Sequence, residues 1–339
     1  MKIGITYNLK DELSPDVIID NESCEEYDNQ DTINAICNVF EKNGYETVKL
    51  GGDIKIAEKI KEENVSFVFN LAEGSYGRNR ESHIPSLLEM LKVPYSGSDP
   101  LTLGITLDKI MTKKIAYQAG IPTPRYVVVS SLRDLPEIER RLTFPLITKP
   151  AWEGSSKGIY NSSKVFTRRE LEASIEVLLA KYPDQPLLVE EYIEGKEITV
   201  GVIGNNPPEI FGIMEIINKA NPGGDVFYSL ETKRNWKELV EYVVSPSLNR
   251  IFHNHIRYRA LAAFKEFGCR DIARIDFKIS EKQHKLFMLE VNPLPGLSPE
   301  YADLVIMAKA QEISYETLVL SILNHALSRY ENNKGILKS

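Results

Sequence analysis

Two apolar runs near the C-terminus constrain the fold most strongly, because together they predict a β-hairpin with a polar face. The runs are Ile272–Ile279 and Phe287–Gly296, and the polar segment Ser280–Lys285 between them has a length suited to a hairpin loop. Successive side chains of a strand point to opposite faces, so Arg274 and Asp276 are expected on one face of the first strand.

The second strand of this predicted hairpin supplies Glu290 and Asn292, which share a face by the same alternation. Pairing of the strands is expected to bring Asp276, Glu290 and Asn292 together beside Arg274. Three oxygen ligands next to a cation suit a Mg²⁺–polyphosphate site, where phosphates complete the metal shell and the arginine stabilises a transferring phosphoryl group. The alternative is a hairpin with an ordinary solvated polar face.

The composition predicts a globular protein of two or three domains without nucleic-acid or membrane partners. The 339 residues are 42% hydrophobic and 26% charged, with a net charge of −7, whereas a sequence-blind nucleic-acid binder usually has a basic excess. We identify no signal peptide or bilayer-spanning run and predict a cytoplasmic location. Cys24, Cys37 and Cys269 are interpreted as reduced thiols, and the five histidines form no zinc motif.

The first hundred residues alternate strand and helix, which predicts a parallel sheet with helices on its faces. We interpret residues 1–98 as a Rossmann-like α/β domain. No Gly-x-Gly-x-x-Gly follows its first strand, so dinucleotide binding is not supported. The expected strands are Lys2–Thr6, Glu46–Leu50 and Ser66–Leu71, and the expected helices are Asp31–Asn43, Ile54–Glu63 and His83–Leu91.

The remaining chain is divided into a second unit, residues 99–186, and a third, residues 187–339. One helix is expected over Leu101–Ala119, and the polar stretch Asn218–Lys237 is interpreted as a long mobile loop of the kind that forms lids. Further strands are expected at Arg125–Val129, Pro145–Lys149, Leu187–Glu191 and Glu197–Ile203, and further helices at Leu132–Arg140, Asn249–Phe267 and Tyr315–Tyr330.

Two polar segments could hold a nucleotide. Glu153–Gly158 follows a strand that ends at Lys149, and its glycines and serines would let backbone N–H groups approach phosphate oxygens. Many ordinary turns have the same composition. The strand–turn–strand Leu187–Ile198 could read adenine through backbone groups, or it could be an exposed acidic hairpin. Lys109 alone fits a solvated helical lysine.

In their order and spacing these motifs resemble those of the ATP-grasp superfamily, and within it the D-alanine:D-alanine ligase family. The resemblance covers most of the chain and implies an ATP-grasp fold behind the N-terminal domain. The matching residues are Phe69–Gly74, Tyr95–Ser98, Leu107–Lys109, Lys149–Pro150, Glu153–Ser156, Glu190–Ile193, Glu197, Phe227–Tyr228, Lys233, Arg274–Asp276, Glu290–Asn292 and Gly296.

The resemblance also implies a role for each matching polar residue. Lys109 and Lys149 would contact ATP phosphates, and Ser155 and Ser156 would lie in the loop that covers them. Arg274 and Lys233 would sit at the reacting phosphoryl group, with Ser155 as a further catalytic candidate. Glu190, Glu191 and Ile193 would surround adenine, Glu197 would take the ribose, and Asp276, Glu290 and Asn292 would hold Mg²⁺.

The resemblance weakens at the amino-acid pockets. Glu73 replaces the histidine of the family's Asn-x-x-His-Gly motif, and the family's ammonium-binding glutamate has no clear counterpart in Asn8–Ser14 or Glu25–Thr32. Leu230 replaces a tyrosine of the lid, Arg234 replaces the tyrosine after its lysine, and the serine-rich run after Gly296 becomes Leu297–Asp303.

Glu73 and Gly296 are therefore the candidate substrate contacts. We expect Glu73 to face the pocket and to hold an ammonium or other cationic group. The alternative is a local salt bridge from Glu73 to Arg78 or Arg80.

These observations favour an ATP- and Mg²⁺-dependent carboxylate–amine ligase that acts through an acylphosphate on amino acids or small peptides. Because the nucleotide residues match while the substrate residues differ, we expect a substrate pair other than two D-alanines. The alternatives are D-alanine:D-alanine ligase itself, a non-catalytic nucleotide-binding module, and a kinase that stops at the acylphosphate. A homodimer is expected by analogy alone.

Overall fold

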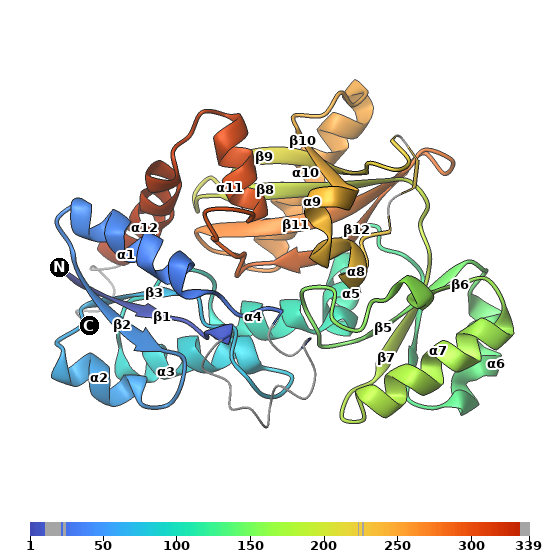
Figure 1. Cartoon of the computed structure of the whole chain (residues 1–339), viewed down its shortest axis with the longest axis horizontal. Coiled ribbons are helices and arrows are strands. Elements are labelled where there is room, and N and C mark those ends of the chain that lie inside the picture. The colour runs from blue at the N-terminus through green and yellow to red at the C-terminus, as the bar shows by residue number, and fades with distance from the viewer. Residues whose placement is uncertain (11–21, 23–24, 223, 226, 333–339) are drawn as a thin grey trace.

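Three separate β-sheets organise the chain (Figure 1). The structure, a computed structural model, describes residues 1–10, 22, 25–222, 224–225 and 227–332. Cys24 and most of Asn8–Ser14 therefore lie outside the described residues. Within the described part, no helix is both long enough and apolar enough to cross a bilayer.

The N-terminal sheet is parallel, as predicted, with β1 between β2 and β3. Its first helix begins where the Asn29 side chain accepts the N–H of Thr32, and it turns Ile33, Ile36 and Phe40 into the core. The elements are β1 (Lys2–Thr6), β2 (Glu46–Gly51), β3 (Phe67–Asn70), α1 (Gln30–Lys42), α2 (Ile56–Glu62), the 3-10 turn η2 (Arg80–Ser82) and α3 (His83–Leu91).

The single helix expected over Leu101–Ala119 is wrong, because the chain breaks there into α4 (Pro100–Leu107) and α5 (Lys109–Gln118). Asp108 between them adopts an extended conformation and its side chain accepts the N–H groups of Ile110 and Met111. This cap satisfies the first donors of α5 and outweighs continuation of the helix. The break places Lys109 at the N-terminus of α5.

The second sheet is antiparallel in the order β4-β7-β5-β6. Because β7 belongs to this sheet, we propose that the second unit ends after Glu191 rather than at residue 186. The elements are β4 (Tyr126–Val129), α6 (Leu135–Arg141), β5 (Leu146–Pro150), β6 (Lys164–Val165), α7 (Arg168–Lys181) and β7 (Leu187–Glu191), with the short 3-10 turns η3 (Leu132–Asp134) and η4 (Asn161–Ser163).

Helix α7 was not predicted, although its sequence carries the signals of a helix. Thr167 caps its first turn by accepting the N–H of Glu170, and Leu171, Ile175 and Leu178 recur at helical spacing and are buried.

The third sheet is antiparallel in the order β10-β9-β8-β11-β12. Neither β9 nor β10 was predicted, since a short apolar run does not reveal by its periodicity whether it is strand or helix. The expected loop Asn218–Lys237 contains α8 and the first two residues of α9. The elements are β8 (Lys196–Ile203), β9 (Glu209–Asn218), α8 (Leu230–Arg234), α9 (Trp236–Leu239), β10 (Val240–Val244), α10 (Arg250–Glu266), β11 (Ile272–Ser280), β12 (Lys285–Asn292), α11 (Asp303–Ala310) and α12 (Tyr315–Asn332).

Two helical layers sandwich this third sheet and hold the units together. Phe252, Ile256 and Phe264 of α10 pack against one of its faces. On the other side, α11 and α12 share a single apolar core with α1 and the N-terminal sheet. The third sheet is thereby held against the N-terminal unit, so that groups on both can face a common cavity.

Candidate active site

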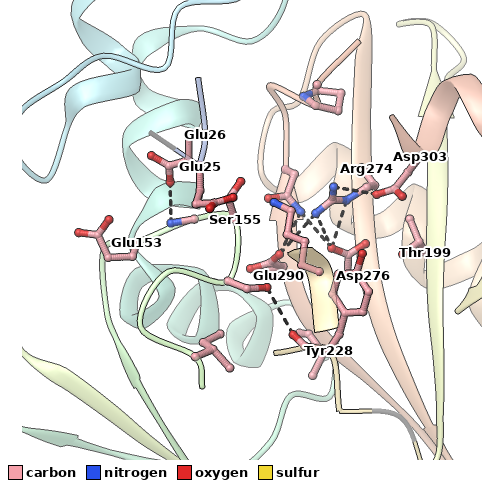
Figure 2. A pocket seen from close by; sticks show the side chains of 18 of the residues that line it. Glu25, Glu26, Glu153, Ser155, Thr199, Tyr228, Arg274, Asp276, Glu290 and Asp303 are labelled. Carbon is pink, nitrogen blue, oxygen red and sulfur yellow. Dashed lines mark hydrogen bonds and ion pairs between the residues drawn. The ribbon is translucent and has the colours of Figure 1, made fainter. Parts of the chain in front are cut away.

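A cavity with a volume of about 520 Å³ lies where the three sheets meet. Residues from every unit line it, among them Glu73 after β3, Lys149 on β5 and Asp276 on β11. Figure 2 shows Glu25, Glu26 and Glu153 on one side of the cavity, and Arg274, Asp276, Glu290 and Asp303 on the other. Every site residue that the sequence predicted lines this cavity.

The predicted hairpin forms and brings its polar residues together. Asp276 is the direct cross-strand neighbour of Glu290, and Arg274 that of Asn292. The Asn292 amide Nδ2 donates to Asp276 Oδ2 at 3.1 Å and to Glu290 Oε1 at 3.4 Å. Arg274 donates to Asp276 Oδ2 at 2.9 Å and to Asp303 Oδ2 at 2.9 Å.

These groups fit a divalent cation. The other carboxylate oxygen of Asp276, Oδ1, is buried and has no hydrogen-bond partner among the described residues. Burial raises the pKa of Asp276 to about 7, and the negative charges of Glu290 and Asp303 add to this shift, whereas Arg274 opposes it. Burial also acts on Glu290, but Lys109 and Arg274 lower its pKa to about 2. Glu290 is therefore ionised, and Asp276 would ionise readily near neutral pH when a cation binds beside it. Two such carboxylates side by side would favour a bound cation.

Protein groups alone would not complete a metal shell here. Across the described chain, no three His, Cys, Asp or Glu side chains are arranged to hold a metal ion. Binding of Mg²⁺ would therefore use the two carboxylates, the Asn292 amide oxygen after rotation of that group, and phosphate oxygens.

Buried lysines form the adjacent end of the cavity. Lys109 is 7% exposed, and its Nζ lies 3.9 Å from Glu290 Oε2 and donates to the backbone carbonyl of Glu153. Lys149 Nζ lies 2.9 Å from Glu190 Oε1, and Lys113 Nζ lies 3.0 Å from the same oxygen. Three lysines around two carboxylates leave this end positive, which suits a polyphosphate.

Glu190 differs from its implied place beside adenine. Its side chain is 1% exposed and is held between Lys113 and Lys149. Burial acts against its charge, but the two lysines lower its pKa. The Glu190 carboxylate therefore positions the two lysines.

Serines bend the loop Glu153–Gly158 over the cavity. Ser155 and Ser156 both have positive φ, 51° and 61°, a conformation that is uncommon outside glycine and recurs at ligand-binding sites. The loop is tied to the N-terminal unit, because Gly154 N donates to Glu26 Oε1 at 2.8 Å. A Cβ at Gly154 would lie 2.5 Å from that oxygen, so glycine is required for the contact.

Glu26 is the hub of this connection and was missed as a site residue. Its carboxylate accepts from Arg80 and from Lys157, each at 2.8 Å. Burial opposes its charge, but Lys157 and Arg80 lower the pKa of Glu26 to about 2. Glu26 is thus ionised, and its negative charge is compensated by Arg80 and Lys157.

The segment that carries Lys233 closes another side of the cavity. Ser229 caps α8 and accepts the N–H of Thr232, which fixes Lys233 in the helix. Burial and the neighbouring Arg274 lower the pKa of Lys233. Asp225 ties this segment down by accepting from Tyr192 at 2.6 Å and Lys164 at 2.9 Å. The segment therefore has the contacts of a closed lid.

The far end of the cavity has the features of a nucleoside pocket. Ile193 is 5% exposed and Glu191 ends β7 beside it. Glu197 Oε2 on β8 lies 3.6 Å from Lys278 Nζ, and burial raises the pKa of Glu197 despite that lysine. A weakly paired carboxylate here could accept ribose hydroxyls. Gly296 lies on the metal side and has no atom near a would-be Cβ, which leaves open space before it.

Glu73 lines the cavity and does not form the local salt bridge that was considered as an alternative. Arg78 pairs with Asp108 at 2.5 Å, and Arg80 pairs with Glu26. Burial and the carboxylates of Glu81 and Glu26 raise the pKa of Glu73 well above its usual value. Glu81 lies in the same stretch of sequence and was missed, although its proximity to Glu73 was a usable signal.

Replacing Glu81 by glutamine is expected to stabilise the ligand-free protein at pH 8 by about 2 kcal/mol. Burial raises the pKa of Glu81 from 4.5 to about 7. The folded state thus holds a proton that the unfolded chain releases, and the free energy of unfolding falls as the pH rises from about 4.5 to about 7. Glutamine does not ionise, so the variant keeps its free energy of unfolding as the pH rises. The expected stabilisation is reduced because removal of the Glu81 charge makes ionisation of Glu73 easier.

Urea unfolding at pH 8 and pH 5 measures this effect, with Glu58→Gln on the exposed surface of α2 as the matched control. The gain should shrink at pH 5. Equal destabilisation by Glu81→Gln at both pH values would show that Glu81 is a structural partner instead.

In sequence and in fold, the chain is similar to proteins of one family. The family model described as D-ala D-ala ligase C-terminus matches residues 115–324. D-alanine–D-alanine ligase of Carboxydothermus hydrogenoformans is 38% identical over 301 residues, which cover 86% of this chain and 91% of that protein.

Solved structures show the same relationship. The ATP complex of D-alanine–D-alanine ligase from Bacillus anthracis superposes with a TM-score of 0.73 at 25% identity, covering 98% of this chain and 99% of that one. VanG D-Ala:D-Ser ligase from Enterococcus faecalis gives a TM-score of 0.71 at 21% identity, covering 96% and 99%, and at that identity shows a shared fold alone.

Proposed function

Because this chain belongs to the D-alanine–D-alanine ligase family, we propose that it joins a carboxylate to an amine through an acylphosphate, with a substrate pair other than two D-alanines. Membership makes it an ATP-dependent enzyme that forms a C–N bond, so the non-catalytic alternative is set aside. The observation that carries the choice of substrate is the acidic wall formed by Glu73, Glu81 and Asp28 in the same cavity as Arg274 and Lys149.

The chemistry requires positioning and charge stabilisation rather than a protein nucleophile. A carboxylate is a poor electrophile, and transfer of the γ-phosphoryl group of ATP gives it a leaving group. Lys109 and Lys149 would hold the phosphates, while Arg274 and Lys233 would stabilise charge on the group in transfer. The amine then attacks the acyl carbon, and phosphate leaves.

The remaining roles follow the same cavity. Asp276, Glu290 and Asn292 would hold Mg²⁺, which would offset the charge of the polyphosphate. Ser155 and Ser156 would cover the phosphates. The backbone of Glu190 with Glu191 and Ile193 would surround adenine, and Glu197 would accept the ribose hydroxyls. The lid segment with Lys233 would keep water away from the acylphosphate.

Incubation with ATP, Mg²⁺ and pools of amino acids tests this proposal. Phosphate release that depends on two amino acids, with a condensed product detected by mass, is expected. Efficient synthesis of D-alanyl-D-alanine, with D-alanine preferred over other amino acids, would restore the ordinary ligase activity of the family. An acylphosphate trapped without any condensed product would favour the kinase.

Replacing Glu73 by glutamine is expected to raise the KM of one amine-bearing substrate and to leave the KM of ATP nearly unchanged. A buried charged hydrogen bond contributes about 1.5–3 kcal/mol, so the rise should be about 10- to 100-fold. Glu62→Gln on the exposed side of α2 is the control. Lower thermal stability with both KM values intact would instead assign Glu73 a structural role.

A further inference from the structure

Three carboxylates on the N-terminal side of the cavity form no direct ion pair with a described residue. Asp28, Glu73 and Glu81 all line the cavity. Among the described residues, their side chains form no hydrogen bond and no ion pair within 4 Å. The neighbouring acids differ, since Glu26 is paired with Arg80 and Lys157, and Glu25 is paired with Arg234 at 2.8 Å.

Glu81 gives this cluster its significance. It is only 9% exposed, so its carboxylate has lost most of its contact with bulk water and yet borders the cavity. An ionised carboxylate in such a place is costly unless a cation pairs with it. The segments 11–21 and 23–24 contain no Lys, Arg or His.

Burial is the main cause of the raised pKa values of Glu81 and Asp28. Burial and the charge of Glu26 raise the pKa of Glu81 to about 7, even though Arg80 opposes the shift. Burial raises the pKa of Asp28 to about 7, and Lys10 compensates only in part. In the absence of a ligand these groups therefore hold protons near neutral pH, which a bound cation would displace.

Charge balance selects among amino-acid substrates. Alanine brings one ammonium and one carboxylate, so it adds no net positive charge to the cavity. Its carboxylate would have to point toward Arg274 and Lys149, where phosphorylation takes place, and its ammonium would satisfy one of the three acids at most. At least two of the acids would remain beside it without a cation from the substrate.

We infer that the substrate on this side is a basic amino acid, with an ammonium or guanidinium group on its side chain in addition to the α-ammonium. The α-ammonium and the side-chain cation together would pair with Glu73, Glu81 and Asp28. This inference rests on the proposed ligase function, because it names the carboxylate-bearing substrate of that reaction.

The test compares lysine, ornithine and arginine with norleucine and alanine, each as both enantiomers, in ATP-dependent phosphate release by the full-length enzyme. Norleucine matches the chain length of lysine and lacks its ε-ammonium. A basic amino acid is expected to exceed norleucine in kcat/KM by about 10- to 100-fold, the effect of one buried charged contact.

Variants locate the source of this preference. Glu81→Gln should raise the KM of the basic substrate about 10-fold or more and leave the KM of norleucine unchanged, whereas Glu58→Gln on α2 should alter neither. If Glu81→Gln fails to fold, Asp28→Asn makes the same comparison.

Three results would overturn the inference. Equal use of lysine and norleucine, or a preference for alanine, would overturn it and leave the ligase function standing. Equal loss of both substrates in Glu81→Gln with wild-type stability would show that Glu81 does not contact the side-chain cation. Absence of phosphate release with every amino acid would overturn the proposed function itself.

Discussion

Replacing Asp276 by asparagine, or Glu290 by glutamine, is expected to lower ATP turnover by at least about 10³-fold and to preserve the fold. Each change removes a negative charge that would face Mg²⁺ and the polyphosphate while it retains the shape of the side chain. The loss of the Asp276 charge should not unfold the protein, because burial already raises its pKa to about 7.

Turnover measured across a Mg²⁺ titration, together with the melting temperature, checks this prediction. Glu281→Gln is the matched control, since Glu281 is exposed in the turn of the same hairpin and lies away from the polar face. Turnover near the wild-type level in Asp276→Asn or Glu290→Gln, with unchanged Mg²⁺ dependence, would refute the assignment of the metal to this hairpin.

Replacing Lys233 by alanine is expected to reduce kcat by about 10²–10³-fold, or ~3–4 kcal/mol, with a much smaller change in the KM of ATP. Lys233 is half-buried near Arg274, and both desolvation and that arginine lower its pKa. A cation held in such a place is unfavourable until negative charge arrives, so its interaction should be strongest when charge develops on the transferring phosphoryl group.

Lys237→Ala separates this effect from a general loss of positive charge on the lid, because Lys237 is exposed on α9. Single-turnover measurements would assign the loss to the chemical step. A wild-type rate in Lys233→Ala would place α8 outside the active site, whereas an equal loss in both variants would show that the lid needs overall charge rather than Lys233.

Several features of this protein followed from local sequence. Alternation within two short strands was enough to group Asp276, Glu290 and Asn292 beside Arg274, because strand geometry repeats every two residues and a short loop fixes the pairing. The parallel N-terminal sheet followed from alternating strands and helices for a similar reason.

Other features were decided by a choice between competing local structures that the sequence pattern leaves open. A cap at Asp108 competed with helix continuation and moved Lys109 to a helix start, where its side chain could enter the cavity. Strands β9 and β10 pair with each other, and β9 also pairs with the preceding strand β8, but their short apolar runs are compatible with strand or helix until that pairing forms.

The acidic wall shows this division most clearly. The sequence identified Glu73 as a departure from the family motif, and it placed Glu25 and Glu26 in a nearby acidic stretch. Only the folded chain decided which of these acids form an ion pair and which do not. Glu26 meets Lys157 and the backbone of Gly154 from 131 and 128 residues away, whereas Glu73 and Glu81 form no ion pair within 4 Å with any residue that the structure describes. Pairing of charges depends on distances in space, which neighbouring residues in sequence do not determine.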